Sequence, residues 1–145
     1  MEYIVFKLMK EHYTIPLEKI KEILVYSQII ITDLFTEDPW VKGVINLRGE
    51  VIPIIDLRIR FNIKNPSYGD DTVAIVIKTS DEKLVGVIVD NIESIMQLKS
   101  SNISPTPSMG MGIDTRYVEG LIKMNHEKMA ALLDIDLVLK LEETV

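Results

Sequence analysis

The sequence contains no cysteine and no long apolar run, and both absences limit what the chain can be. Without cysteine it can form no disulfide, thiolate nucleophile or zinc–thiolate site, which suits a reducing compartment. A membrane-spanning helix needs about 18 or more consecutive apolar residues, and no stretch reaches that length. The start Met1-Glu2-Tyr3 also lacks the pattern of a signal peptide. We therefore expect a cytoplasmic chain with no direct membrane insertion.

Positive charge and aromatic side chains are also scarce. The chain has 16 Lys and Arg against 22 Asp and Glu, a net charge of −6, and only 6% aromatic residues. A non-specific nucleic-acid binder needs a basic face that displaces counterions, and a single-strand binder also needs exposed aromatics. We expect no nucleic-acid partner.

Patterns typical of catalysis are missing as well. There is no glycine-rich phosphate-binding loop, and Ser100, Ser101 and Ser104 lack a nucleophile-elbow pattern. His12 and His126 each fall in a predicted hairpin turn, without a cysteine or second histidine nearby, so we expect them to be exposed turn residues. The sequence therefore predicts no enzyme, no metal site and no cofactor.

The most informative stretch is residues 42–61. It contains two β-rich apolar runs, Val44–Leu47 and Val51–Ile55, joined at Arg48-Gly49, where Gly49 can adopt the positive φ that a tight hairpin turn needs. Arg48 is therefore predicted at an exposed tip. Asp56 follows the second run and is a good N-cap for a short helical segment, because its carboxylate can accept from free backbone N–H groups.

The same order recurs later in the chain. Gly120 opens a strand, a polar turn and a second strand follow, and Asp134 then precedes a final apolar segment. A second pair of segments, Leu17–Leu24 and Val89–Met96, aligns without a gap at an offset of 72. The repeat predicts two similar modules within 1–145, approximately halves 1–66 and 70–145, allowing strand exchange between them.

Several local expectations complete this prediction. Glu11-His12 is expected to form the first hairpin turn, and Ile29–Thr32 to continue the third strand. Thr72–Thr79 and Leu84–Val89 are expected to pair as a hairpin, with the first strand central because it is apolar on both faces. Asp134–Glu143 is predicted as an amphipathic helix, with these side chains facing the barrels: Ile135, Leu137, Val138 and Leu141.

A group of apolar residues at equivalent places in the repeat has two interpretations; its members are Leu17, Ile20 and Ile23 in one half and Ile92, Ile95 and Met96 in the other. They could all be core residues, or some could line a groove where the two modules meet and where a helix or another barrel could bind. In the second interpretation, Ile20 and Ile95 should be partly exposed and should face each other across the junction of the barrels.

Four stretches carry a family resemblance. Residues 42–61, with Asn-Leu-Arg-Gly at 46–49 and Asp-Leu-Arg at 56–58, resemble the signature of the CheW family of chemotaxis coupling proteins, and so do residues 84–90, 103–107 and 117–121. The resemblance implies a mostly β fold of two packed five-stranded SH3-like β-barrels with short helical segments and a C-terminal helix. It also implies a non-enzymatic adaptor that couples the cytoplasmic tip of a methyl-accepting chemoreceptor to the regulatory domain of the histidine kinase CheA, at membrane-associated receptor arrays.

The resemblance also suggests sites. Its receptor groove would fall on Ile20, Glu22, Ile23, Arg48, Ile92 and Ile95. Its second kinase contact, which closes rings in receptor arrays, would fall on the loop from Ser104 to Met109. Two features depart from the family pattern. Residues 33–38 form a longer and more acidic approach to the signature, and Met109 stands where an aromatic residue can occur.

Other functional classes remain open on the sequence. A coupling module fused to a receiver domain shares the barrels, but 145 residues leave no room for a further domain of about 120 residues. A generic small-barrel interaction module, or a nucleic-acid or ligand-binding barrel, is the alternative to the adaptor.

Overall fold

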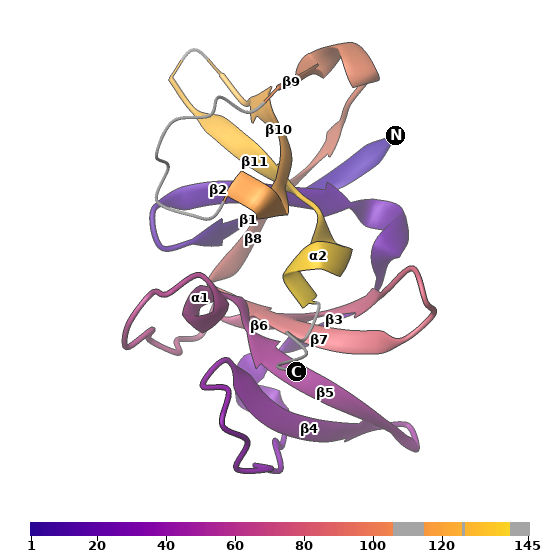
Figure 1. Cartoon of the computed structure of the whole chain (residues 1–145), viewed down its shortest axis with the longest axis vertical. Coiled ribbons are helices and arrows are strands. Elements are labelled where there is room, and N and C mark those ends of the chain that lie inside the picture. The colour runs from indigo at the N-terminus through magenta and orange to yellow at the C-terminus, as the bar shows by residue number, and fades with distance from the viewer. Residues whose placement is uncertain (106–114, 126, 140–145) are drawn as a thin grey trace.

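Two β-sheets lie one above the other, with the short helix α2 (Ile135–Leu139) between them and α1 (Leu57–Arg60) beside their junction (Figure 1). The structure, a computed structural model, describes residues 1–105, 115–125 and 127–139. The mostly β architecture with short helical segments and a C-terminal helix is confirmed. Within these residues, no helix has the length and apolar character needed to cross a membrane.

The five-stranded sheet uses one continuous part of the chain. Its strand order is β3-β6-β7-β5-β4, and all neighbours are antiparallel except β5 and β7. β6 is an inner strand, paired with β3 on one side and with β7 on the other, and the predicted β6–β7 hairpin is confirmed. The strands are β3 (Ile20–Val25), β4 (Val41–Leu47), β5 (Glu50–Asp56), β6 (Val73–Lys78) and β7 (Leu84–Val89).

The six-stranded sheet joins the two ends of the chain. Its strand order is β8-β1-β2-β11-β10-β9, with β2 and β11 parallel. The two-residue strand β9 is additional to the five strands expected for this module. The strands are β1 (Glu2–Leu8), β2 (Glu11–Pro16), β8 (Asn91–Gln97), β9 (Ile103–Ser104), β10 (Val118–Lys123) and β11 (Met129–Leu133).

The two sheets have equivalent connectivity, and each combines strands from both approximate halves, which is the strand exchange that the sequence allowed. In the five-stranded sheet, β3 pairs with β6 of the β6–β7 hairpin, and β7 runs parallel to β5 of the β4–β5 hairpin. In the six-stranded sheet, β8 pairs with β1 of the β1–β2 hairpin, and β2 runs parallel to β11 of the β10–β11 hairpin. The N-terminal hairpin β1–β2 therefore lies in the sheet formed by the end of the chain. The chain passes between sheets at two places, a 3₁₀ turn at Leu17–Lys19 (the first crossover) and Asp90 (the second crossover).

Two glycines mark the equivalence in the backbone. Gly43 in β4 and Gly120 in β10 both lie where the register of their hairpin shifts. A Cβ on Gly43 would lie 2.0 Å from the carbonyl oxygen of Thr32, and a Cβ on Gly120 would lie 2.9 Å from that of Ser104. At both positions, the absence of a side chain lets another segment pair with the strand. Thr32 forms a bridge to Val44 beside Gly43, and β9 pairs with β10, which contains Gly120.

The local predictions are confirmed at the turns and caps. Arg48 and Gly49 have φ values of 50° and 90°, as expected for the two central residues of a tight hairpin turn. Asp56 accepts a hydrogen bond from the backbone N–H of Arg58 (3.0 Å), and Asp134 accepts from that of Leu137 (3.2 Å).

Other expectations were wrong. The first hairpin turn lies at Met9 and Lys10, so His12 is a buried residue of β2 and not an exposed turn residue; the apolar alternation around Tyr13 extends the strand through it. Residues 29–32 form no continuation of β3, because a 3₁₀ turn at Tyr26–Gln28 intervenes and only Thr32 makes a β-bridge.

The final helix needs a correction too. Ile135 and Val138 are buried as predicted, whereas Leu137 is exposed, because α2 buries only one face against the sheets. Two of the earlier expectations, for His126 and Leu141, lie outside the described residues.

The largest apolar cluster holds the two sheets together, and we call it the junction cluster. It combines the inner side chains of β1 and β2 with those of β6, β7 and both helices, including Ile4, Phe6, Ile75, Ile77 and Val138. Each sheet has a smaller cluster of its own on its other face.

Aromatic rings extend through this junction. The rings of Phe6, Tyr13, Phe61 and Tyr117 form a chain with successive centroids 6.1, 5.8 and 5.9 Å apart. Burial and the nearby charge of Glu11 raise the pKa of Tyr13 to about 12, so its ring remains neutral at physiological pH.

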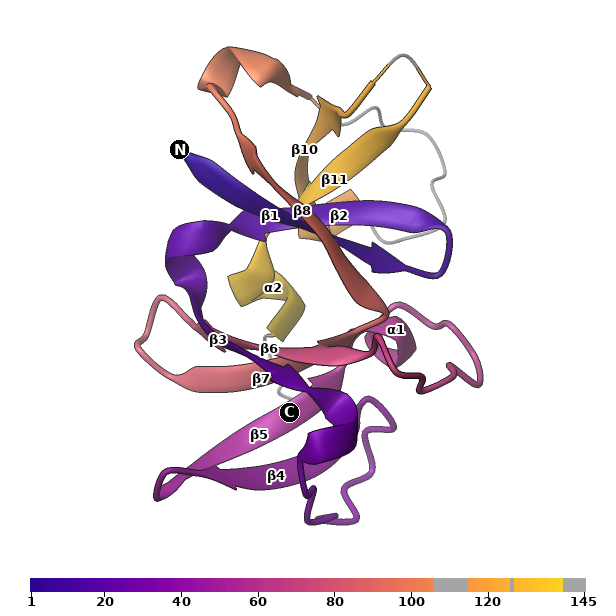
Figure 2. The ribbon, with the colours of Figure 1, turned by 180° about the vertical axis from the view of Figure 1, so that it is seen from behind.

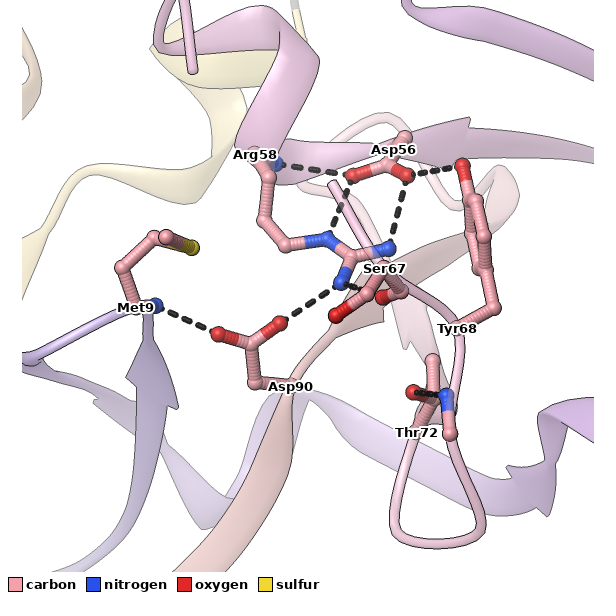
Figure 3. A network of polar contacts seen from close by, with 8 residues as sticks. Met9, Asp56, Arg58, Ser67, Tyr68, Thr72 and Asp90 are labelled. Atoms are coloured by element: carbon pink, nitrogen blue, oxygen red, sulfur yellow. Dashed lines mark hydrogen bonds and ion pairs between the residues drawn. The ribbon is translucent and has the colours of Figure 1, made fainter. Parts of the chain in front are cut away.

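A buried ion network supports the junction at α1 (Figure 3). The side chain of Arg58 is 0% exposed and donates from Nε and Nη2 to both oxygens of Asp56, each at 3.0 Å. Its Nη1 donates to Asp90 Oδ1 at 2.6 Å and to the carbonyl of Ser67 at 2.5 Å. Asp90 also accepts from the backbone N–H of Met9, so Arg58 links the five-stranded sheet to the β1–β2 turn.

Tyr68 closes the network on the outer side. Its hydroxyl donates to Asp56 Oδ2 at 2.6 Å, and its ring lies 4.7 Å from the Arg58 guanidinium carbon and stacks on Tyr26. Burial and the hydrogen bond to Asp56 raise the pKa of Tyr68. Burial alone would lower the pKa of Arg58, but the hydrogen bonds and charges of Asp56 and Asp90 raise it. The network therefore keeps a fully buried cation charged.

We predict that Arg58→Met destabilises the protein by about 3–5 kcal/mol, because it leaves the buried Asp56 carboxylate without its cation. Arg58→Lys is the matched control; it keeps the charge but not the two parallel bonds, so its loss should be smaller. Urea unfolding monitored by circular dichroism measures both. A loss below about 1 kcal/mol for Arg58→Met would show that the network does not stabilise the fold.

Candidate interaction surface

Two of the predicted site residues, Glu22 and Arg48, form an ion pair between β3 and the β4–β5 turn. Arg48 donates from Nη1 to Glu22 Oε1 at 3.3 Å, and its Nη2 contacts Oε2. The Arg48 side chain is 72% exposed, as expected for a turn tip, and the hydrogen bond and charge of Glu22 raise its pKa. Residues 26 positions apart in the sequence thus present one charged group at the edge of the sheet.

The isoleucines of β3 divide between the core and the surface. Ile23 is 43% exposed, whereas Ile20 is half-buried and packs against the junction cluster. The register of β3 on β6 shifts between Ile20 and Glu22 at a bulge, and beyond it half-buried Glu22 and Leu24 alternate with exposed Ile23 and Val25.

The residues of β8 show the same division. Ile95 is 56% exposed, and Ile92 is half-buried against the junction cluster. The expectation that Ile20 and Ile95 are partly exposed is confirmed. β8 is an edge strand of the six-stranded sheet and β3 is an edge strand of the five-stranded sheet. Figure 2 shows both strands reaching the junction between the sheets. The six residues therefore come from both sheets.

The second predicted site is described only in part. Ser104 is exposed at the end of β9, where it pairs with Leu121 of β10. Met109 lies outside the described residues.

A further apolar surface was missed in the sequence. Ile29 and Ile31 pack against the inner cluster of the five-stranded sheet, whereas Ile30 between them is 87% exposed. Thr32, two residues later, exchanges backbone hydrogen bonds of 2.8 and 2.9 Å with Val44 of β4. The extended segment before β4 therefore turns Ile30 toward solvent, on the face where Thr32 and Val44 lie.

The outer face of the β4–β5 hairpin continues this surface. Val44 lies opposite Pro53, and Asn46 lies opposite Val51, which is 72% exposed. Paired residues share a face of a sheet, so these side chains point away from the core. We call Ile30, Val51 and Pro53 the outer patch. The signal in the sequence was the strict alternation of Val51 and Pro53 with the buried Ile52 and Ile54.

Asp136 joins α2 to the first crossover and to the turn after β6, a contact that no pattern in the sequence predicted. Its Oδ1 accepts from the backbone N–H of Ser80 at 2.8 Å; its Oδ2 accepts from Ser80 Oγ at 2.6 Å and from Lys19 Nζ at 3.1 Å. We call Asp136 with these partners the Asp136 anchor. Burial alone would raise the pKa of Asp136, but hydrogen bonds from Ser80 and the charge of Lys19 lower it.

Residues 1–105, 115–125 and 127–139 contain no group of three or more His, Asp or Glu side chains that could hold a metal ion.

Comparison with known proteins identifies the family. A family model for the CheW-like domain matches residues 2–143. The chain belongs to this family.

Individual relatives agree. The chemotaxis protein CheW of Klebsiella aerogenes is 37% identical over 142 residues, covering 98% of this chain and 83% of the relative. That of Bacillus subtilis is 32% identical over 142 residues, covering 97% and 88%. Among solved structures, the scaffolding protein TtCheW from Thermoanaerobacter tengcongensis matches with a TM-score of 0.86 and 28% identity, covering 97% of this chain and 88% of that one.

Membership of the CheW family settles the class of function. The chain is a non-enzymatic scaffold protein of chemotaxis signal transduction that couples chemoreceptors to the kinase CheA. The alternative of a nucleic-acid or ligand-binding barrel is thereby set aside.

We predict that Ile23→Asp folds normally, because Ile23 projects into solvent, and that Ile20→Asp loses about 2 kcal/mol or more of stability, because it places a charge against the junction cluster. Ile95→Asp should behave like Ile23→Asp. Thermal unfolding by circular dichroism separates the two outcomes. Equal losses at positions 20 and 23 would contradict the division between half-buried Ile20 and exposed Ile23.

We predict that Asp136→Asn destabilises the protein at neutral pH. This loss of stability should shrink as the pH falls below 3.8, the ordinary pKa of an aspartate side chain. A lowered folded-state pKa contributes stability above the ordinary value and loses it as the pH falls through the folded value. Burial and the charges of Asp134 and Asp136 raise the pKa of nearby Glu119, an effect of opposite sign on stability that the Asp136→Asn variant keeps only in part. Urea unfolding at several pH values measures the difference, and a difference independent of pH would contradict the prediction.

Proposed function

We propose that the six residues Ile20, Glu22, Ile23, Arg48, Ile92 and Ile95 form the receptor surface, which binds the cytoplasmic tip of a methyl-accepting chemoreceptor. The observation that carries the proposal is the exposure of Ile23, Arg48 and Ile95 at the edges of two different sheets. Exposed apolar side chains beside a charged group are typical of protein contacts.

The arrangement suits a helical partner. Edge strands of small sheets leave grooves in which the apolar face of a helix can lie, and the exposed isoleucines would supply the apolar contact. Arg48 reaches beyond the core of the hairpin and could exchange its bond with Glu22 for an acidic or amide group on the receptor helices.

A scaffold needs a second surface for its second partner, the regulatory domain of the kinase CheA. Ile30 and Val51 of the outer patch are 87% and 72% exposed, and the patch shares no residue with the receptor surface. We assign the first kinase contact to this patch. The second contact, which would close rings, is assigned to the loop from Ser104 to Met109 on the basis of the family resemblance. The protein would then work in the cytoplasm at membrane-associated receptor arrays.

The test of this function is binding by Arg48→Ala. The variant should keep its melting temperature, because exposed ion pairs add little stability, and should bind a soluble receptor-tip fragment on the order of tenfold more weakly. Isothermal titration calorimetry with the receptor fragment and with the kinase regulatory domain measures each partner separately. Kinase binding should not change.

Lys83→Ala is the matched control, since Lys83 is an exposed cation on another hairpin turn. In the same titrations, Val51→Asp should weaken kinase binding alone, and Met109→Asp should leave one-to-one kinase binding intact while reducing larger assemblies in sedimentation. Receptor binding by Arg48→Ala equal to that of Lys83→Ala would remove Arg48 from the receptor surface.

A further inference from the structure

The two crossovers are held by helix residues at equivalent positions, and the charges are reversed. Arg58 is the second residue after the N-cap Asp56 in α1, and Asp136 is the second residue after Asp134 in α2. Arg58 binds Asp90, the second crossover, and Asp136 binds Lys19, the last residue of the first crossover. Each helix therefore anchors a point where the chain passes between the sheets.

The two anchors differ in their exposure to solvent. Arg58 is fully buried, whereas the side chains of Lys19 and Asp136 are 29% and 32% exposed. Lys19, Thr79 and Ser80 also line a surface hollow of about 330 Å³. Solvent screening weakens charge pairs of this kind, so the Asp136 anchor can open at much lower cost than the Arg58 network.

The Asp136 anchor lies at the start of β3, one of the two strands that carry the proposed receptor surface. Ile20 follows Lys19 directly, and the strand continues to Glu22 and Ile23. Ser80 lies in the turn after β6, the strand on which β3 pairs, with Ile20 opposite Ile77. One carboxylate thus holds both the start of β3 and the end of its neighbour, from a helix that follows the last strand of the other sheet.

We propose that Asp136 is a positioning residue of the receptor surface: through Lys19 and Ser80 it sets the placement of β3 relative to β8. This rests on the proposed receptor surface, whose residues are divided between those two strands. The half-buried start of β3 and its bulge leave the strand dependent on what holds its first residues. A receptor helix that contacts both strands therefore binds best while the anchor is closed.

The test compares Asp136→Asn, which removes the charge at constant shape, with Asp81→Asn. Asp81 lies on the same β6–β7 turn, pairs with Lys83, and makes the matched charge change without a bond to α2. Amide hydrogen exchange is followed over residues 20–25 and, as an internal reference, over residues 41–47 of the same sheet. Affinities for the receptor-tip fragment and the kinase regulatory domain are measured at a temperature where every variant is folded.

Asp136→Asn should speed exchange in residues 20–25 but not in 41–47, and should weaken receptor binding by roughly two- to thirtyfold with kinase binding unchanged. Lys19→Met should do the same, and Asp136→Glu should restore part of the affinity. Unchanged exchange in β3, equal acceleration in both segments, or the same effect from Asp81→Asn would overturn the proposal. If the unmodified protein does not bind the receptor fragment, the proposed function fails, and the exchange pattern alone decides whether Asp136 positions β3.

Discussion

The structure depends on the apolar junction between its two sheets, because the chain passes between them at only two points in the described residues. β1 and β2 bury their inner side chains against β6 and β7, which belong to the other sheet. Since the N-terminal hairpin completes the sheet formed by the C-terminal strands, neither sheet is a product of one half of the chain. Burial of a shared apolar surface is therefore what brings the two sheets into one unit.

The junction also explains the choice of polar contacts. A buried cation is costly unless its bonds are all made, and Arg58 is surrounded by acceptors from Asp56, Asp90 and Ser67. Such a network fixes one arrangement of the sheets, because any shift would leave a charge without partners. At the first crossover, the side chains of Lys19 and Asp136 are partly exposed to water, so a shift of the sheets there loses little free energy from this charge pair. The two ends of the junction thus have unequal stiffness.

The repeat, the hairpins and the caps could be predicted from the sequence because they depend on local chemistry. Gly49 needs a positive φ, Asp56 caps the residues that follow it, and alternating apolar residues define the strands. The exchanged hairpin could be allowed but not assigned, since β1–β2 would pair equally well on paper with either set of strands. His12 was misplaced because a turn at Met9 and Lys10 has none of the usual turn residues.

The site residues show where reasoning from one sequence ends. Their strand positions followed from the repeat, but the exposure of each side chain depends on what its strand packs against, and the β3 bulge is a property of the pairing with β6. Arg58 carried no sequence signal for its burial, since basic residues after an N-cap are ordinarily exposed.

Scaffolding sets a physical requirement different from that of catalysis. No proton or electron has to be moved; instead, separate surfaces must keep their relative orientation while partners bind and leave. The side chains of the proposed receptor surface accordingly come from edge strands and a turn tip, with the buried interior behind them. A surface divided between β3 and β8 is sensitive to the angle between the sheets, and α2, buried through Ile135 and Val138, lies where that angle is set. In this arrangement a receptor that contacted both strands of the proposed surface would respond to the relative placement of the two sheets as well as to single side chains.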